Sequence, residues 1–442
     1  MTDSPPRRTG GRILVDQLRI QGCDRLFTVP GESFLAVLDA LHDTPDIEVV
    51  VCRQEGGVTY MADADGKLTG RPGVAFVTRG PGATNASAGV HVAFQDSTPM
   101  ILFVGDLDRA DRDREGFQEI DMAAFFAPIA KWAARIDDAR RIPEYVARAY
   151  RVATAGRPGP VVLAIPEDML RDEVAALDRL PVPSVCESPD PGAIAALFEL
   201  LKDAAAPVAI VGGADWSPCA AHHFASFAER IGLPVAAAFR RQDAVANDCK
   251  VYAGNTGYGP NPKLSERIRT ADLLLVVGAR LGESTTDGYK LITPDHPGQT
   301  IVHVHPDPNE LGRVYHADLP ICSDMGEFAM VVAAWDEPDL LPFGAGAEAH
   351  AEWLEWSEPQ PRDGMAMDLG VAMKLLREKL PGDTIVCNGA GNFSGWVHRY
   401  WRYAATPSQL APTSGSMGYG LPGAVAAAIR FCDRKVLCVA GD

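Results

Sequence analysis

The sequence predicts an α/β protein with three consecutive doubly wound parallel-sheet domains, the third of them incomplete. Apolar runs of strand length alternate with helix-like segments along most of the chain, and two stretches rich in Pro and polar residues interrupt this alternation. Strands that alternate with helices imply a parallel sheet covered by helices on both faces. With 442 residues the chain also exceeds what one hydrophobic core usually holds, so several domains are expected.

The first domain, expected to span residues 1–182, shows the alternation most clearly. A basic and aromatic passage separates its fourth expected strand from the last helix and strand. The expected helices cover residues 13–20, 34–41, 58–68, 84–94 and 143–155, and the expected strands cover residues 25–29, 47–52, 74–78, 100–104 and 160–165.

Two segments are expected to link the domains. Residues 180–191 are rich in Pro, Ser and Asp, and residues 337–363 are acidic and rich in Pro. Between them lies the central α/β domain, residues 190–340. Its expected strands cover residues 207–211, 233–238, 273–277 and 300–304.

The third domain, residues 365–442, offers too few elements to close a doubly wound sheet of its own. We therefore expect it to be truncated at its C-terminus, with the missing part supplied by a longer chain or by another polypeptide. Its expected elements are a helix at residues 369–380, a strand at 384–387, a loop at 388–395, a helix after residue 421 and a strand at 436–440.

Composition and charge exclude several classes of function. The 41 basic and 58 acidic residues give a net charge of -17, which opposes binding to nucleic acid or to an anionic membrane. No apolar run is long enough to span a membrane and the N-terminus lacks the apolar core of a signal peptide, so a cytoplasmic protein is expected. Nine cysteines without a Cys-x-x-Cys pair argue against a disulfide framework and a zinc site.

Two features at the ends of neighbouring strands indicate a ligand site in the first domain. Glu55 follows one apolar run and opens a helix, where a carboxylate interacts favourably with the helix dipole. The glycine turn Gly80-Pro81-Gly82 follows the next run and opens another helix, at the edge where open α/β sheets bind ligands. Each feature alone is better explained by an ordinary helix start. Together they favour half of a cofactor site.

Two other patterns do not support a site. The glycines of residues 389–395 resemble a dinucleotide fingerprint, but their spacing is wrong for NAD. His303 and His305 share one face of an expected strand, yet no third ligand is spaced to join them on a metal ion. An ordinary strand end is therefore expected at these histidines.

Further motifs extend the pattern over nearly the whole chain. They are the Arg-Gln-Glu-Gly-Gly of residues 53–57, residues 78–99, the Gly-Phe-Gln-Glu of residues 116–119, Lys131, the Gly-Arg-Pro-Gly-Pro of residues 156–160 and residues 416–422. In this order the motifs resemble those of the acetolactate synthase-like family of thiamine diphosphate-dependent enzymes. Within that family, they resemble the large catalytic subunits. That family includes 2-oxo acid decarboxylases and carboligases.

The resemblance implies a pyrimidine-binding first domain, a central domain and a diphosphate-binding third domain. It implies that Glu55 hydrogen-bonds the aminopyrimidine ring of thiamine diphosphate and favours the imino tautomer that removes the C2 proton of the thiazolium. The cofactor then acts as an electron sink, and the protein supplies orientation and polarity. By the same resemblance, catalytic roles are expected for Glu55, Phe117, Lys131 and Asp106.

The resemblance also assigns the residues that hold the cofactor and its metal. Met417 takes the place of the large apolar residue that keeps the cofactor bent. Asp442 matches the first magnesium ligand of a Gly-Asp-Gly motif, and Mg²⁺ prefers hard oxygen ligands of this kind. The expected cofactor-binding residues are Pro30, Gly31, Gly80, Gly82 and Asn85 in the first domain and Gly391, Asn392, Phe393, Ser416, Met417 and Gly441 in the third.

Two departures from the family's pattern leave alternatives open. Asp106 stands where acetolactate synthases carry Gln, and it either faces the cofactor or pairs with Arg109 at the surface. Residues 254–257 and 282–286 differ from the sequences of flavin-binding members, so FAD is an alternative that the resemblance does not establish.

The expected reaction decarboxylates a small-molecule 2-oxo acid and transfers the acyl carbanion to an oxo acid or an aldehyde. Simple decarboxylation by a 2-oxo acid decarboxylase and a non-catalytic homologous subunit are the alternatives. The resemblance further implies a homodimer or a homotetramer, with no nucleic acid or membrane as partner.

Overall fold

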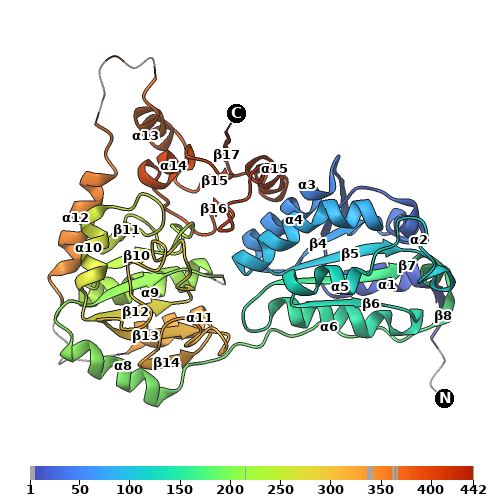
Figure 1. Ribbon diagram of the computed structural model, residues 1–442, viewed down its shortest axis with the longest axis horizontal. Coiled ribbons are helices and arrows are strands. Elements are labelled where there is room, and N and C mark those ends of the chain that lie inside the picture. The colour runs from blue at the N-terminus through green and yellow to red at the C-terminus, as the bar shows by residue number, and fades with distance from the viewer. Residues whose placement is uncertain (1–4, 215, 336–341, 361–363, 365–366, 442) are drawn as a thin grey trace. The chain divides into compact units, whose positions relative to one another are not determined.

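The computed structural model describes residues 5–214, 216–335, 342–360, 364 and 367–441. Its contacts divide the chain into two compact units (Figure 1). Unit 1 extends to Val185 and includes Val425–Arg430, whereas unit 2 runs from Cys186 to Ala424 and resumes at Phe431. Apart from residues 425–430, the central and third domains expected from the sequence thus lie in one unit.

Unit 1 is built on a six-stranded parallel sheet in the order β3-β2-β4-β5-β7-β6. The strand order reverses between β2 and β4, and open α/β sheets bind ligands at the carboxyl side of such a switch point. The strands are β2 (Arg25–Thr28), β3 (Glu48–Val51), β4 (Gly73–Val77), β5 (Met100–Asp106), β6 (Trp132–Arg135) and β7 (Pro160–Pro166), beside a separate antiparallel pair of β1 (Arg7–Thr9) and β8 (Glu173–Ala175).

The central strands of this sheet are fully buried. Every residue of β4, β5 and β7 is buried, which explains their continuous apolar runs, since a strand covered on both faces has no solvent side. The sequence did not predict β6, because its four residues, Trp-Ala-Ala-Arg, are only partly buried at the sheet edge and form no apolar run.

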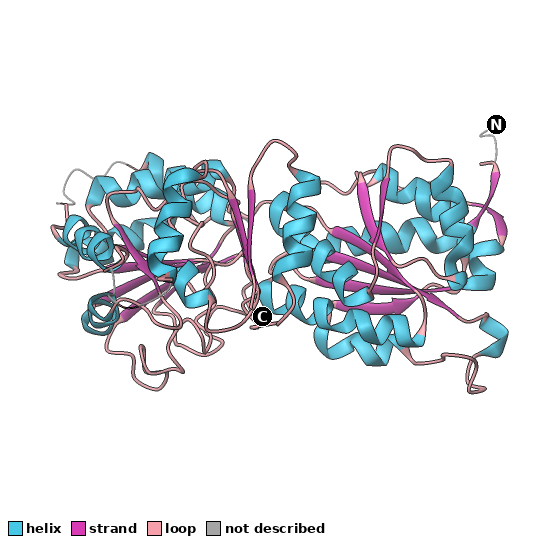
Figure 2. Ribbon diagram, turned by 90° about the horizontal axis from the view of Figure 1, so that it is seen from above, coloured by secondary structure: helices cyan, strands magenta, loops and turns pink. Residues whose placement is uncertain are grey.

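Helices lie on both sides of the strands in unit 1, which makes the sheet doubly wound (Figure 2). Side chains of α1, α2 and α6 share one core cluster with β4, β5 and β7. The helices are α1 (Gly10–Ile20), α2 (Leu35–His42), α3 (Glu55–Thr69), α4 (Gly80–Asp96), α5 (Met122–Phe126), α6 (Ile142–Thr154) and α7 (Glu167–Arg171), with short 3-10 turns at Glu32–Phe34, Arg109–Asp111, Ala127–Ile129 and Ala139–Arg141.

The helices α3 and α4 pack with their backbones in close approach. A Cβ added to Gly89 would lie 2.2 Å from the Oγ1 atom of Thr59, and that hydroxyl donates a hydrogen bond of 3.0 Å to the carbonyl of Ala86. At the far end of the pair, the buried ammonium of Lys67 lies 2.7 Å from Asp63 and also contacts Asp96 of α4. These contacts fix the two helices to each other along their length.

Unit 2 contains a second six-stranded parallel sheet, in the order β11-β10-β9-β12-β13-β14. The sequence did not predict its two outer strands, β11 and β14. The strands are β9 (Val208–Val211), β10 (Val235–Ala237), β11 (Tyr252–Asn255), β12 (Leu273–Val277), β13 (Thr300–His305) and β14 (Leu319–Cys322). The helices α8 (Pro191–Asp203), α9 (Pro218–Ile231) and α11 (Met325–Ala334) share one core with this sheet, and α10 (Pro262–Thr270) and α12 (Ala345–Trp356) share another.

The prediction of a linker at residues 337–363 is wrong for residues 345–356, which form α12. Trp353 of α12 is 4% exposed and packs edge-on against Tyr252, with ring centroids 4.8 Å apart. The acidic residues that suggested a linker include Glu352 and Glu355, which lie near Lys263 of α10. Residues 336–341 and 361–363 lie outside the described residues.

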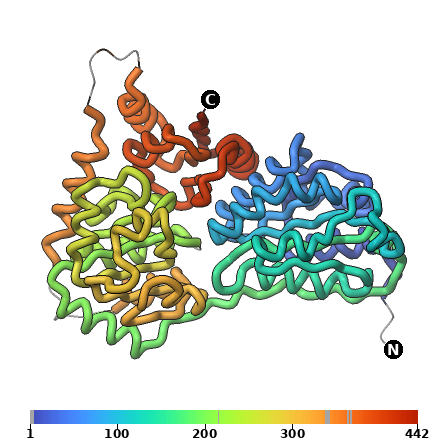
Figure 3. Tube along the Cα trace, viewed as in Figure 1, coloured from blue at the N-terminus to red at the C-terminus, as the bar shows by residue number. Residues whose placement is uncertain are grey.

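The last part of unit 2 forms a three-stranded parallel sheet in the order β16-β15-β17. Two of its strands were expected, whereas the two-residue β16 was not. Figure 3 traces this part of the chain in orange and red. The elements are α13 (Leu369–Lys379), β15 (Ile385–Asn388), α14 (Ser394–Tyr400), β16 (Gln409–Leu410), α15 (Gly420–Arg430) and β17 (Val436–Val439).

Buried polar groups join this sheet to the segment that follows β10. The Oδ2 atom of Asp243 accepts hydrogen bonds from the backbone N–H groups of Ser408 and Gln409, at 2.9 and 3.1 Å. The Asn247 amide oxygen accepts a further bond of 2.8 Å from the N–H of Tyr403. Because all five residues are buried, these bonds replace water that the polar groups have lost.

Among the described residues, no helix has the length and apolar character needed to cross a lipid bilayer.

Two buried histidines predict acid sensitivity of unit 2. Burial, together with the charge of His303, lowers the pKa of His305 to about 4, and burial lowers the pKa of His303 as well. Since the unfolded chain binds these protons near pH 6.5 and the folded chain does not, stability is complete above pH 6.5 and is lost as the pH falls toward 4. For His305 alone the loss should reach about 3 kcal/mol at pH 4.

The substitution His305→Asn keeps an acceptor for the N–H of Asp307, which donates to His305 Nδ1 at 3.0 Å. Guanidinium unfolding between pH 7 and 4 should show a smaller acid loss in this variant than in the wild type, although Glu310 and Asp307 still face the site. His296→Asn, at an exposed position, serves as control. An acid loss equal in His305→Asn and the wild type would contradict the assignment to His305.

Candidate active site

Glu55 and Asn85 meet at the carboxyl edge of the sheet in unit 1. Glu55 is the first residue of α3, directly beyond β3, and it is half-buried. The Nδ2 atom of Asn85, in α4, donates a hydrogen bond of 3.1 Å to its Oε2 atom. A Cβ added to Gly82 would lie 3.5 Å from the other carboxylate oxygen. The structure therefore brings together three residues that the sequence assigned to one site.

The glycine turn that opens α4 lies against a loop. Gly80 has φ +30°, and a Cβ added to it would lie 2.5 Å from the carbonyl oxygen of Gln118. The carboxylate of Glu119 holds this loop by accepting the N–H groups of Asp113 and Gly116, at 2.7 and 2.8 Å. Phe117, at the tip of the loop, is 79% exposed, so its ring is available to a ligand at this edge.

The ends of β2 and β4 are joined directly at the switch point. A Cβ added to Gly31 would lie 2.7 Å from the Cβ atom of Thr78, and the hydroxyls of Thr78 and Ser33 are 2.9 Å apart. Pro30, before Gly31, is exposed. The sequence signal for Thr78 and Ser33 was weak, because single hydroxyl residues at strand ends are common.

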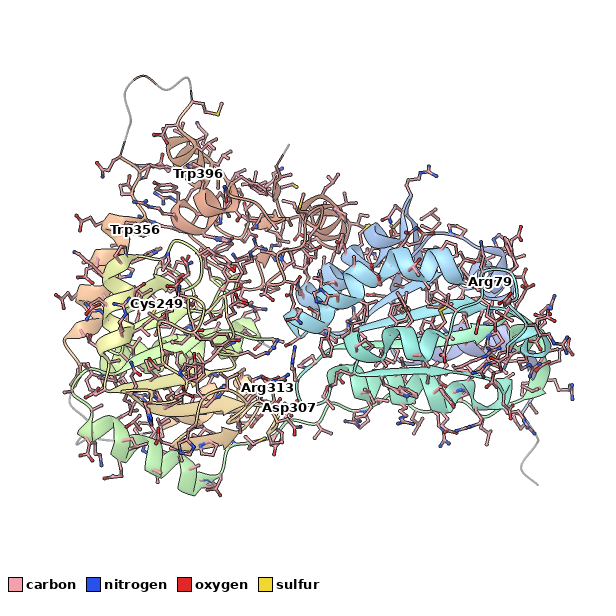
Figure 4. The ribbon with its side chains drawn as sticks, in the orientation of Figure 1. Arg79, Cys249, Asp307, Arg313, Trp356 and Trp396 are labelled. Carbon is pink, nitrogen blue, oxygen red and sulfur yellow. The ribbon has the colours of Figure 1, made fainter. Side chains whose placement is uncertain are left out.

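Arg79 stands between this hydroxyl pair and the glycine turn. It lies 3.4 Å from Glu167 of α7 and is labelled in Figure 4. This contact joins the end of β4 to the helix that follows β7. The glycine turn that opens α4 therefore lies between this ion pair and the loop that carries Gln118.

Asp106 does not pair with Arg109 at the surface, which corrects one of the two alternatives. It ends β5, is 2% exposed and lies 3.1 Å from the Nη1 atom of Arg135. Its other oxygen accepts the N–H of Leu107 at 2.9 Å, whereas Arg109 pairs with Asp168 at 2.7 Å. Burial raises the pKa of the Asp106 carboxyl against the opposing charge of Arg135.

A small cavity of about 90 Å³ lies beside the Asp106–Arg135 pair. The loop that carries Phe117 supplies part of its wall. Its charged lining residues are Asp106, Arg112, Asp113, Glu119, Asp121 and Arg135.

Lys131 is separated from the other candidates within unit 1. It directly precedes β6, and the register of β6 with β7 places it at the amino edge of the sheet. Its ammonium donates a hydrogen bond of 2.6 Å to the carbonyl of Ala155, and its stem lies over Gly159. Glu55 and Asp106 follow their strands at the opposite edge, so a joint role within this unit is not supported.

The third-domain candidates gather at the carboxyl edge of the three-stranded sheet in unit 2. Gly391, Asn392 and Phe393 follow β15, and the ring of Phe393 lies 3.1 Å from a Cβ added to Gly441, which follows β17. Gly391 has φ +146°, a conformation that favours glycine.

A second loop reaches the same edge from the N-terminal side of α15. A Cβ added to Gly389 would lie 3.7 Å from the carbonyl oxygen of Ser416. Met417 is 80% exposed beside it. Because parallel strands end at one edge, residues 389, 416 and 441 converge although they are far apart in sequence.

Two residues at this edge were missed by sequence reasoning. Asn388, at the end of β15, is fully buried, and its Oδ1 atom has no hydrogen-bond partner in the part of the chain that the structure describes. Arg240, from the segment after β10, donates hydrogen bonds to the carbonyls of Gly389 and Pro412. The Phe-Arg-Arg-Gln-Asp that follows the apolar run at 233–238 was the available signal for Arg240.

Asp442, expected as a magnesium ligand, lies outside the described residues. Within the described ranges, no three side chains of His, Cys, Asp or Glu are grouped to hold a metal ion.

Comparison with protein families identifies three domains. The N-terminal TPP binding domain of thiamine pyrophosphate enzymes matches residues 8–125. Their central domain matches residues 194–331, and their C-terminal TPP binding domain matches residues 389–442. Glu55 and Asn85 thus fall in the first match, and the edge formed by Gly391, Ser416 and Gly441 falls in the last.

Individual relatives agree with the family matches. The chain is 31% identical to the acetolactate synthase large subunit of Parasynechococcus marenigrum, over 100% of this chain and 73% of that protein. It is 28% identical to the acetolactate synthase large subunit of Lactococcus lactis, over 98% of this chain and 76% of that protein. It is also 28% identical to the acetolactate synthase of Bacillus subtilis, over 99% and 77% of the two chains. The chain therefore belongs to the thiamine pyrophosphate-dependent enzymes, within their acetolactate synthase-like group.

Proposed function

We propose that the protein is a carboligase that uses thiamine diphosphate and Mg²⁺ to decarboxylate a small 2-oxo acid and join its acyl carbanion to an oxo acid or aldehyde. The observation that carries the proposal is the Glu55 carboxylate held by Asn85 at the switch-point edge of the domain that matches the N-terminal TPP binding domain. A carboxylate in this place is positioned to hold a proton at a ring nitrogen.

The residues at the third-domain edge fit a diphosphate. Three glycines, Gly389, Gly391 and Gly441, bring no side chain of their own to this edge beside the ring of Phe393, so a ligand can approach their backbone closely. The buried Oδ1 atom of Asn388 is an acceptor, so it suits a cation such as Mg²⁺ and not the oxygens of the diphosphate. We propose Asp442 as the first ligand of Mg²⁺, which prefers carboxylate and phosphate oxygens.

The cofactor supplies the electron sink for the acyl carbanion when it is bound. The residues of the protein hold the proton and support the cofactor. Glu55 holds the proton at its carboxylate, and Asn85 fixes the orientation of that carboxylate at 3.1 Å. The loop at 113–119 lies against Gly80 of the glycine turn, and the exposed ring of Phe117 offers an apolar contact at this edge. Met417, exposed beside Ser416, offers an apolar support for the bound ring system.

We further propose a homodimer or homotetramer in the cytoplasm, in which Lys131 acts across a subunit boundary. Its distance along the sheet from Glu55 supports this division, because one unit does not bring the two side chains together. FAD is not part of the proposal.

The substitution Glu55→Gln tests the proton relay. It keeps the size of the side chain and an oxygen for Asn85, but it removes the group that holds the proton. Exchange of the C2 proton of bound thiamine diphosphate for deuterium should slow by about two to four orders of magnitude, the usual contribution of a general acid or base. NMR after acid quench measures this exchange in the full-length protein. Glu199→Gln, on an exposed face of α8, is the control, and exchange at the wild-type rate in Glu55→Gln would remove Glu55 from the mechanism.

The substitution Asp106→Asn tests whether the cavity beside Arg135 selects the acceptor. Without the carboxylate, the positive charge of the Arg135 guanidinium, 3.1 Å away, is no longer neutralised by Asp106. The cavity should then favour an anionic acceptor. In competition between pyruvate and acetaldehyde, the ratio of acetolactate to acetoin should rise severalfold. Asp168→Asn, which loses the pair with Arg109, is the matched control. A ratio that stays at the wild-type value would place acceptor choice elsewhere.

The proposed oligomeric state is tested by measuring the mass of the protein in solution. Light scattering of the full-length protein at micromolar concentration should give twice or four times the chain mass, because the family's domains imply a cofactor held between subunits. A monomeric mass with full activity would contradict this proposal.

A further inference from the structure

Arg240 occupies an unusual position in the central part of unit 2. It follows β10 at the carboxyl end of that sheet, with φ +60° and 4% exposure. A left-handed backbone is unfavourable at a residue other than glycine, and it persists only where the surrounding contacts over-determine it. The contacts of this arginine therefore hold it in place.

Those contacts are the two loops of the third-domain edge. The Nη2 atom of Arg240 donates to the carbonyl of Gly389 at 3.2 Å, and its Nη1 atom donates to the carbonyl of Pro412. Gly389 is the first residue of the loop that carries Asn392 and Phe393, and Pro412 is the second residue of the loop that carries Ser416 and Met417. One side chain from the central domain thus holds both loops near their starts.

The two hydrogen bonds also set the direction of the peptide groups that follow. In a trans peptide, the carbonyl of one residue and the N–H of the next point to opposite sides. Because the carbonyls of Gly389 and Pro412 point toward Arg240, the N–H groups of Ala390 and Thr413 point away from it. Both residues are partly exposed, whereas Gly389 and Pro412 are buried, so these N–H groups face the outer side of the edge.

The positive charge of Arg240 acts on its surroundings in unit 2. Its guanidinium lies 4.9 Å from the ring centroid of Phe239. Burial and the charge of Arg240 together lower the pKa of His398, in α14, to about 3. An anion at the nearby edge would experience the same charge with little screening, because the intervening groups are buried.

We infer that Arg240 is a positioning residue for the diphosphate: it fixes the two loops of the third-domain edge so that their backbone N–H groups face the ligand, and it adds positive charge behind them. This inference rests on the proposed function. It concerns a residue of the central domain, which contacts the loops and not the reacting atoms.

The test compares binding of two probes to the full-length protein by calorimetry, thiamine diphosphate with Mg²⁺ and thiamine alone. Arg240→Met should weaken binding of thiamine diphosphate by about tenfold or more, the usual effect of losing charge-assisted hydrogen bonds. Binding of thiamine should change little, since it has no diphosphate. Arg240→Lys, which keeps the charge and reaches one carbonyl, should recover part of the affinity.

Two further variants separate positioning from a merely structural role. Arg240→Gly suits φ +60° and so preserves the local backbone, yet it should show the same selective loss as Arg240→Met. Arg230→Met removes a comparable arginine, which donates to the carbonyls of Val332 and Ala333 in the same unit. It should leave the affinity for both probes unchanged.

The outcomes are distinct. If the wild type binds thiamine diphosphate and the folded Arg240→Gly variant binds it equally well, the inference is overturned while the proposed function stands. Equal losses for both probes, or a loss in Arg230→Met as large as in Arg240→Met, also overturn it. A wild type that does not bind thiamine diphosphate overturns the proposed function itself.

Discussion

The parallel arrangement of strands is the constraint on which the rest of this molecule depends. In a parallel sheet every strand ends at the same edge, and the helix that follows a strand starts there with unpaired N–H groups. Unit 1 places Gly31, Glu55, Gly80 and Asp106 at that edge because each ends or follows a different strand. Unit 2 repeats the arrangement with its small sheet. Polar groups distant in sequence therefore meet without any need for a long loop.

Close packing of α3 and α4 fixes the positions of the side chains that the strand ends bring to this edge. The edge alone would place Glu55 and Asn85 in the same region, but their bond of 3.1 Å requires the two helices to keep a fixed separation. Gly89 against Thr59 provides it, since no side chain intervenes. The buried Lys67 between two carboxylates opposes sliding of one helix along the other, because breaking such a pair leaves an uncompensated charge.

Sequence reasoning found the elements that carry continuous apolar runs. It recovered β4, β5, β7 and β12, and it found Glu55 with the Gly80 turn because both follow such runs. It missed β6 and β16, which are short and lie at sheet edges, where burial imposes no pattern. It misread α12 as a linker, since the acidic residues of its outer face outweighed Trp353 on its inner face.

The site itself was less accessible to prediction. Asp106 was placed correctly at a strand end, but its partner Arg135 lies on β6, a strand that the sequence did not reveal. Lys131 was grouped with Glu55 by motif order, although strand direction puts it at the other edge. Arg240 acts from another domain, so no spacing within the third domain could indicate it. Contacts between domains leave little trace in the local sequence pattern of apolar and polar residues.

The contact between Gly89 and Thr59 has a consequence for how this enzyme tolerates change. Gly89 is buried in α4 against Thr59 and carries no functional group of its own. Yet any side chain there must push α3 from α4, and a separation of even a few tenths of an ångström is enough to lengthen the hydrogen bond on Glu55. A side chain at position 89 would therefore disturb the site from the interior of the helix pair, although the position has no chemistry of its own.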